Sequence, residues 1–281
     1  MYPPPTFSWI DWHWHPDIII GVMLLEGLYL LGIGPLRRRY SWADLVPRGR
    51  VVLFSLGVLT IYLTLSSPLH ELSDNFLFSA HMVQHLLLTL LIPPLLLWGA
   101  PDWLLRPFLL RYSLVPRIGR LMTAPIAAFI IFCGVLLVWH FPFLYNLTLT
   151  NHAAHVLEHL MFLAVAVVMW WPVLSPLPEM PRASYPVQML YLFFLSLPLG
   201  FLGAAITFSG HVLYPWYAEV PRIWGISAIA DQQVGGLIMK LPGALTFLTA
   251  LGVVFFTWYN RQTVEPGQPD WTAPALAEKV E

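Results

Sequence analysis

Long apolar runs, each closed by proline, glycine or charged residues, recur seven times along the chain. A helix needs about 20 mainly apolar residues to cross the hydrocarbon core of a bilayer, and prolines and glycines at the ends of a run are typical of helix boundaries. The pattern therefore predicts seven transmembrane helices. We expect them at Asp17–Pro35, Arg50–Pro68, His81–Gly99, Pro125–His140, His155–Pro172, Val187–Phe208 and Val234–Tyr259. The fourth is short unless residues from Leu121 onward join it.

Composition supports the same interpretation. Of the 281 residues, 58% are hydrophobic and only 10% are charged, whereas a soluble domain carries about 25% charged residues. We therefore predict an all-α, polytopic membrane protein, a seven-transmembrane-helix bundle surrounded by the lipid bilayer. The 14 basic residues barely match the 15 acidic ones, which excludes a nucleic-acid-binding protein. The single cysteine, Cys133, excludes a disulfide scaffold and a cysteine-based zinc site.

Basic residues are concentrated in alternate connections between the predicted spans, and the other connections hold only Arg222. They follow the first, third, fifth and seventh spans, at Arg37, Arg38, Arg39, Arg48, Arg50, Arg106, Arg111, Arg117, Arg120, Arg182, Arg261 and Lys279. Cytoplasmic loops carry the excess of Lys and Arg, so we expect the N-terminus outside and the C-terminus inside. The predicted organisation is an extracytoplasmic tail over residues 1–16, a transmembrane domain over 17–260 and a cytoplasmic tail over 261–281. Because residues 1–16 lack a basic start, we interpret them as a translocated tail and not as a signal peptide.

All ten histidines lie in the segments that this topology places on the extracytoplasmic side, namely the outer tail, the outer loops and the outer ends of the spans. They are His13, His15, His70, His81, His85, His140, His152, His155, His159 and His211. Two pairs, His81 with His85 and His155 with His159, have i, i+4 spacing, so each pair shares one helix face. A single such pair at a membrane interface is more often a polar helix start, but two pairs at matching depth favour one metal site.

We predict that His81, His85, His155 and His159 are the chief metal ligands. His140 and His152 lie at the same level and are the next candidates. Imidazole-rich sites suit copper first and zinc second, and we expect Cu(I); b-type haem held by paired histidines is the main rival. Glu158 and Asp231 are expected to orient the imidazoles through their other ring nitrogens. Met82, Met161 and Cys133 are expected to pack as apolar side chains.

Two charges lie within the predicted spans. Glu26 in the first and Lys240 in the seventh have similar depths, and a lone charge in the bilayer is costly. We therefore predict a buried ion pair between them, with a structural role in preference to a proton or ion relay.

Several ordered motifs carry a family resemblance. They are His81-Met-Val-Gln-His85 with Pro93-Pro94 and Gly99-Ala-Pro101, Trp139-His140-Phe-Pro142 with Tyr145, His155-Val-Leu-Glu158-His159 with Trp170-Trp171-Pro172, and Asp231-Gln-Gln-Val-Gly-Gly-Leu-Ile-Met239. With them the chain resembles, from about Asp17 to Tyr259, the CtaG family of cytochrome c oxidase assembly factors of the caa3 type. The resemblance implies a seven-helix protein of the bacterial cell membrane.

The implied role is insertion of copper at the copper-B centre of haem–copper oxidase subunit I. Such a role needs no catalytic residues, so we expect a metal chaperone and not an enzyme. The alternatives are a membrane oxidoreductase subunit with b-type haem, a transporter and an interaction scaffold. The tail that carries His13 and His15 lies outside the resemblance, and a homo-oligomer is compatible with all of these features.

Overall fold

The computed structural model describes residues 7–10, 12 and 15–264, and all regular structure in those ranges is helical. This confirms the all-α fold class. In chain order the elements are α1 (Pro16–Leu31), a π-helical segment (Gly32–Leu36), α2 (Arg37–Tyr40), α3 (Arg48–Ser66), α4 (Pro68–Asn75), α5 (Phe78–Leu86), a second π-helical segment (Leu87–Leu91), α6 (Ile92–Gly99), α7 (Asp102–Leu109), α8 (Leu114–Met122), α9 (Pro125–Trp139), α10 (Pro142–Thr150), α11 (His152–Leu174), α12 (Tyr185–Thr207), α13 (Trp216–Glu219) and α14 (Ala228–Val264).

Six helical stretches in the described chain are long and apolar enough to cross a membrane. They are Pro16–Tyr40, Arg48–Ser66, Phe78–Gly99, His152–Leu174, Tyr185–Thr207 and Ala228–Gln262. These correspond to six of the seven predicted spans.

The fourth predicted span differs from the expectation. Helix α9 has only 15 residues, and α8 meets it at a bend of 73° instead of extending it, so a seventh span exists only if the bent pair is counted as one. The bend has a local cause. Ala124 precedes Pro125 and is extended, with ψ 137°, because a proline disfavours the helical conformation of the residue before it.

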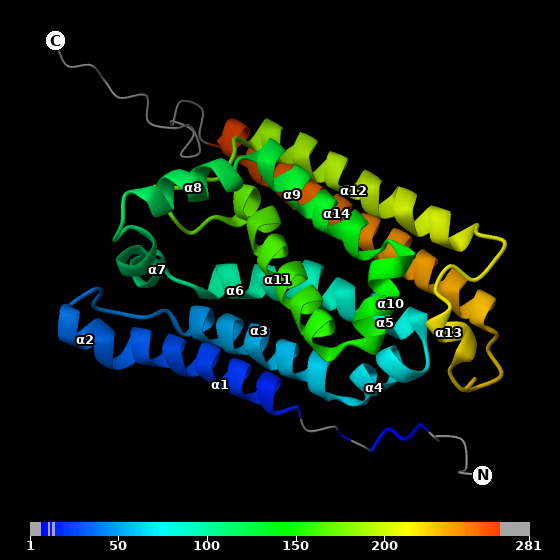
Figure 1. The fold of residues 1–281 in the computed structure, drawn as a ribbon. Helices are drawn as coiled ribbons and strands as arrows, with labels where there is room; N and C mark the ends of the chain where they lie inside the picture. The colour runs from blue at the N-terminus through cyan, green and yellow to red at the C-terminus, as the bar shows by residue number, and fades with distance from the viewer. Residues whose placement is uncertain (1–6, 11, 13–14, 265–281) are drawn as a thin grey trace.

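The helices form an elongated bundle in which α12 and α14 run side by side, α3 packs between α1 and α6, and α11 packs against α9 and α6 (Figure 1). Small residues set the closest approach in this bundle. A Cβ atom on Gly203 of α12 would meet the Gly236 carbonyl of α14, and one on Gly236 would meet the Thr207 hydroxyl and the Gly203 carbonyl. The absence of side chains at these positions therefore allows α12 and α14 to pack closely.

The two ends of the bundle differ in chemistry. The connections at one end are formed by α2, α7 and α8, which carry arginines, whereas α4, α10 and α13 lie at the other end beside the starts of α5 and α11 (Figure 1). The histidine-bearing helix starts thus lie at the end opposite to the basic connections, as the sequence predicts. Which end faces the cytoplasm remains a prediction from the charge distribution.

The predicted Glu26–Lys240 pair does not form. The Ser55 hydroxyl donates a 2.6 Å hydrogen bond to Glu26 Oε1, and no ion pair joins Glu26 to Lys240 within the described residues. Helix α1 packs on α3, whereas α14 lies on the far side of the bundle against α12 and α5 (Figure 1). Similar depth along the membrane normal did not determine the positions of the two helices around the bundle.

Candidate metal centre

Two helix starts carry the central side chains, and each is fixed by a polar cap. The Asn151 side chain accepts a hydrogen bond from the Ala154 amide at the start of α11. The start of α5 is held by Asp231 of α14, whose carboxylate accepts from the amides of Phe78 at 2.8 Å and Ser79 at 3.1 Å. We expected Asp231 to orient an imidazole, but it caps the start of α5. This cap fixes the depth at which His81 lies.

Three of the four predicted chief ligands converge, together with a carboxylate. The Nε2 atoms of His81 and His85 lie 2.8 Å apart, and the Glu158 oxygens lie 3.9 Å from Nε2 of His81 and 3.7 Å from Nε2 of His85. One ligand atom from each of these residues and from His159 falls within 4.8 Å of all the others. We call His81, His85, Glu158 and His159 the buried group, because all four side chains are buried.

The spacing of the buried group suits a single ion. Two ligands bound at about 2.0–2.1 Å to a tetrahedral ion lie roughly 3.3 Å apart, and the separations of 2.8–3.9 Å among His81, His85 and Glu158 lie on either side of that value. The polar atoms are also short of partners. Neither oxygen of Glu158 accepts a hydrogen bond, and Nδ1 of His85 has no hydrogen-bond partner. The hydroxyl of the nearby Thr148 donates to the Tyr145 carbonyl and not to Glu158. Unpartnered buried polar atoms are costly, and a cation would compensate the Glu158 charge.

The fourth predicted ligand, His155, belongs to a second set. Its Nδ1 lies 3.3 Å from Asp74 Oδ2, and Nε2 of His70 lies 3.6 Å from the same oxygen. We call His70, Asp74 and His155 the cavity group; one ligand atom from each lies within 4.8 Å of the others. The other nitrogen of His155, Nε2, is 3.2 Å from Nε2 of His159, so this ring lies between the two groups.

Sequence reasoning missed two members of the cavity group. His70 is among the ten histidines noted in the sequence but not among the predicted ligands, and Asp74 is not named there. The structure places both on the short helix α4, where their i, i+4 spacing puts them on one face. That spacing was the available signal, but the short segment gave no reason to expect a helix there.

The next predicted candidates, His140 and His152, lie apart from the buried group. His140 ends α9 with Nδ1 2.8 Å from the Leu136 carbonyl; its Nε2 is buried without a partner, and its ring centroid is 5.7 Å from that of His85. His152 is 70% exposed and lies 3.4 Å from Asp17. His15 stacks edge-on against His70, and His13 lies outside the described residues.

The remaining soft atoms pack in the core, in agreement with the expectation from the sequence. Met82 and Cys133 are buried in the main apolar cluster, and Met161 packs against it.

Tyrosine side chains close the buried group on one side. The Tyr217 hydroxyl donates to the Ser73 carbonyl at 2.7 Å and lies 3.4 Å from Nδ1 of His81. Burial raises the pKa of Tyr217 and of Tyr145 well above the usual range. Both phenols therefore stay protonated and add no charge to the site.

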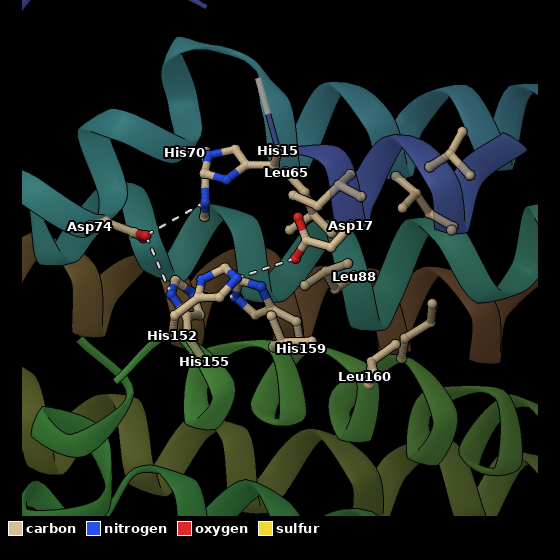
Figure 2. A pocket seen from close by; sticks show the side chains of 16 residues that line it. His15, Asp17, Leu65, His70, Asp74, Leu88, His152, His155, His159 and Leu160 are labelled. Atoms are coloured by element: carbon tan, nitrogen blue, oxygen red, sulfur yellow. Dashed lines mark hydrogen bonds and ion pairs between the residues drawn. The ribbon is translucent and has the colours of Figure 1, made fainter. Parts of the chain in front are cut away.

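Several of these histidines also line a cavity of about 350 Å³ (Figure 2). Its wall includes all three members of the cavity group and His159 of the buried group. His15, Asp17 and His152 add further polar side chains, and apolar residues of α1, α3, α11 and the second π-helical segment complete the lining.

Comparison with known proteins decides the family. The profile of the cytochrome c oxidase caa3 assembly factors (Caa3_CtaG) matches residues 27–261. The chain belongs to this family. The match confirms the resemblance suggested by the motifs and includes every member of the buried and cavity groups, whereas His15 and Asp17 precede it.

Curated relatives of this chain include uncharacterized proteins of Mycobacterium bovis and Mycobacterium tuberculosis. Each is 30% identical over 270 residues, which is 89% of this chain and 40% of the relative. A protein of Mycobacterium leprae is 25% identical over 273 residues, 91% of this chain and 41% of the relative. The chain thus spans about two fifths of the length of the curated relatives it matches. No solved structure shows significant similarity.

Proposed function

We propose that this assembly factor binds a copper ion at the buried group and delivers it to the copper-B centre of haem–copper oxidase subunit I. The convergence of His81, His85, His159 and Glu158 carries the proposal, since it supplies three imidazoles and one carboxylate at ligand spacing. Membership of an oxidase assembly family supports the destination. The ion is cargo, so the protein acts as a carrier and not as a catalyst.

The choice of copper follows from the ligand types. Neutral imidazole suits copper and zinc, whereas magnesium and calcium require more oxygen ligands. The oxygen of Glu158 makes the set harder than an all-histidine site, so zinc is the competitor that a metal analysis must separate from Cu(I). Haem has less support. The ring centroid of Phe162 lies 4.5 Å from that of His85, and the ring centroid of Tyr145 lies 5.2 Å from that of His81. These rings occupy the space that a macrocycle between paired axial histidines would need.

Location in the bilayer supports delivery by lateral contact. His81 and His85 lie in the first turns of α5, within a stretch able to span the membrane. With the basic connections inside, this end of the bundle faces the extracytoplasmic side of a bacterial cell membrane. A donor that meets subunit I within the same bilayer then holds its ion just below the outer surface.

The test is the copper content of the oxidase in cells. Cells with His85→Ala or His159→Ala should assemble oxidase that holds haem but has much less copper-B, with partial recovery when copper is added. His211→Ala is the matched control, since His211 is exposed in the loop after α12 and its side chain is outside both groups. Full copper-B in the His85→Ala and His159→Ala strains, at normal abundance of the assembly factor, would refute the proposal.

A further inference from the structure

We infer that the cavity group, His70, Asp74 and His155, is a second metal site, through which the copper ion enters the buried group. This inference rests on the proposed function, because it assumes that the cargo is a metal ion. It adds a site with its own ligands, on a different helix pair and facing a cavity.

The geometry of the cavity group is that of three ligands around one ion. Asp74 Oδ2 lies 3.3 Å from Nδ1 of His155 and 3.6 Å from Nε2 of His70. Both values are close to the roughly 3.3 Å that separates neighbouring ligands of a tetrahedral ion. The set shares no residue with the buried group, so both sites can be filled at once.

The imidazole of His155 connects the two sites. Its Nδ1 faces Asp74 and its Nε2 lies 3.2 Å from Nε2 of His159. Only the imidazole ring of His155 therefore separates an ion at the cavity group from His159 of the buried group. Transfer is a ligand exchange in which the bonds to His70, Asp74 and Nδ1 of His155 break as bonds to His159 and the other members of the buried group form. The oxidation state of the ion does not change, so the step needs no electron donor or acceptor.

Access supports the same direction of travel. His81 and Glu158 have no exposed surface, whereas His155 and His159 line the cavity (Figure 2). His152, with its side chain 70% exposed, and Asp17, 41% exposed, lie 3.4 Å apart in the cavity lining. An ion entering through the cavity can thus meet the polar side chains and the cavity group before it reaches His81 and Glu158, which have no exposed surface.

Asp74 has an alternative role in which it binds no metal and only orients the histidine rings beside it. A carboxylate that accepts a hydrogen bond from Nδ1 of a histidine fixes the ring so that Nε2 can bind metal, and Asp74 Oδ1 also lies 4.0 Å from Nδ1 of His81. Gln84 Nε2 lies 3.2 Å from Nδ1 of His70, which favours His70 as a hydrogen-bond donor to Asp74. Stoichiometry separates the two roles, because a positioning residue adds no ion.

The experiment titrates purified full-length chain with Cu(I), under reducing conditions, against a chromophoric Cu(I) chelator. We expect two ions per chain for the wild type, one for the His70→Asn/Asp74→Asn variant, one for His85→Ala and two for the control His211→Ala. In the double asparagine variant, loading of the remaining ion from the chelator should also be at least tenfold slower. Elution volume and thermal transition, matched to His211→Ala, check that each variant is folded.

Each other outcome has a distinct meaning. A wild type that binds one ion, lost in His85→Ala and merely weakened in the asparagine variant, overturns the second site and leaves the proposed function standing. One ion that is lost in the asparagine variant and kept in His85→Ala overturns the buried site and retains the cavity site. A wild type that binds no copper refutes both. A wild type that binds only one ion refutes the account with two filled sites, even if a variant fails to fold.

Discussion

Glu158 Oε2 lies 3.9 Å from Nε2 of His81, and neither side chain has any surface exposed to solvent. A carboxylate from α11 thus lies among imidazoles of α5, without a hydrogen-bond donor of its own. Ionising a buried carboxyl group without a partner is costly, whereas a bound cation makes the ionised carboxylate a favourable ligand. This relationship links the stability of the bundle to the presence of its ion.

Glu158→Gln should separate these two effects. The amide carries no charge, so the metal-free variant should be as stable as the wild type or more stable. Its thermal transition should rise much less on addition of copper, since ligand stabilisation is about 2.7 kcal/mol when the free ion is 100 times Kd and falls as Kd increases. Thermal unfolding with and without copper measures both quantities. A metal-free variant less stable than the wild type, with an unchanged copper shift, would contradict this role.

Asp231→Ala should loosen α5. The carboxylate accepts from two amides at the start of that helix, and loss of such a cap costs about 0.5–2 kcal/mol. Because the cap sets the depth of His81, copper affinity should fall as well. Thermal unfolding and copper titration test this prediction, with Asn151→Ala as the matched loss of the α11 cap. Unchanged stability in Asp231→Ala would show that α5 does not depend on the contact.

Two glycines on α12 should respond differently to alanine. A Cβ on Gly203 would lie 2.6 Å from the Gly236 carbonyl of α14, whereas one on Gly200 meets nothing within 4 Å. Overpacking typically costs about 1–3 kcal/mol, so Gly203→Ala should destabilise the bundle by that order and Gly200→Ala should not. The comparison uses unfolding in detergent. Equal effects at both positions would argue against close packing of α12 on α14.

The orientation of the bundle can be tested by labelling. Leu45 is 83% exposed between α2 and α3, and His211 is exposed at the opposite end. In a Cys133→Ala background, an impermeant thiol reagent added to intact cells should label His211→Cys and leave Leu45→Cys unlabelled until the cells are opened. The reverse pattern would place the histidine end in the cytoplasm and remove the basis for delivery on the outer side.

The sequence predicted the features that depend on local periodicity. Apolar runs located six spans, and the i, i+4 spacing paired His81 with His85 and His155 with His159. It could not predict contacts set by how helices are arranged around the bundle. Glu26 therefore has Ser55 as a partner instead of Lys240, and Asp231 caps a helix 152 residues away in sequence.

Side-chain direction produced the other differences. Four histidines at one depth suggested one site, but the two ring nitrogens of His155 face different groups. Glu158 was expected to contact the ring nitrogens that do not bind the metal, but its oxygens lie near the Nε2 atoms of His81 and His85. The rotation of α11 that determines both contacts arises from its packing on α9 and α6, which periodicity within one helix does not contain.

X-ray absorption spectroscopy of the copper-loaded protein tests the buried site most directly. The His70→Asn/Asp74→Asn variant, loaded with one equivalent of Cu(I), should show a shell of nitrogen and oxygen only, with the multiple scattering of about three imidazoles. The same variant carrying His81→Ala, His85→Ala and His159→Ala should lose that signal, and the control with His211→Ala should retain it. A sulfur scatterer, or an imidazole signal that survives loss of the three histidines, would contradict the buried group as the copper site.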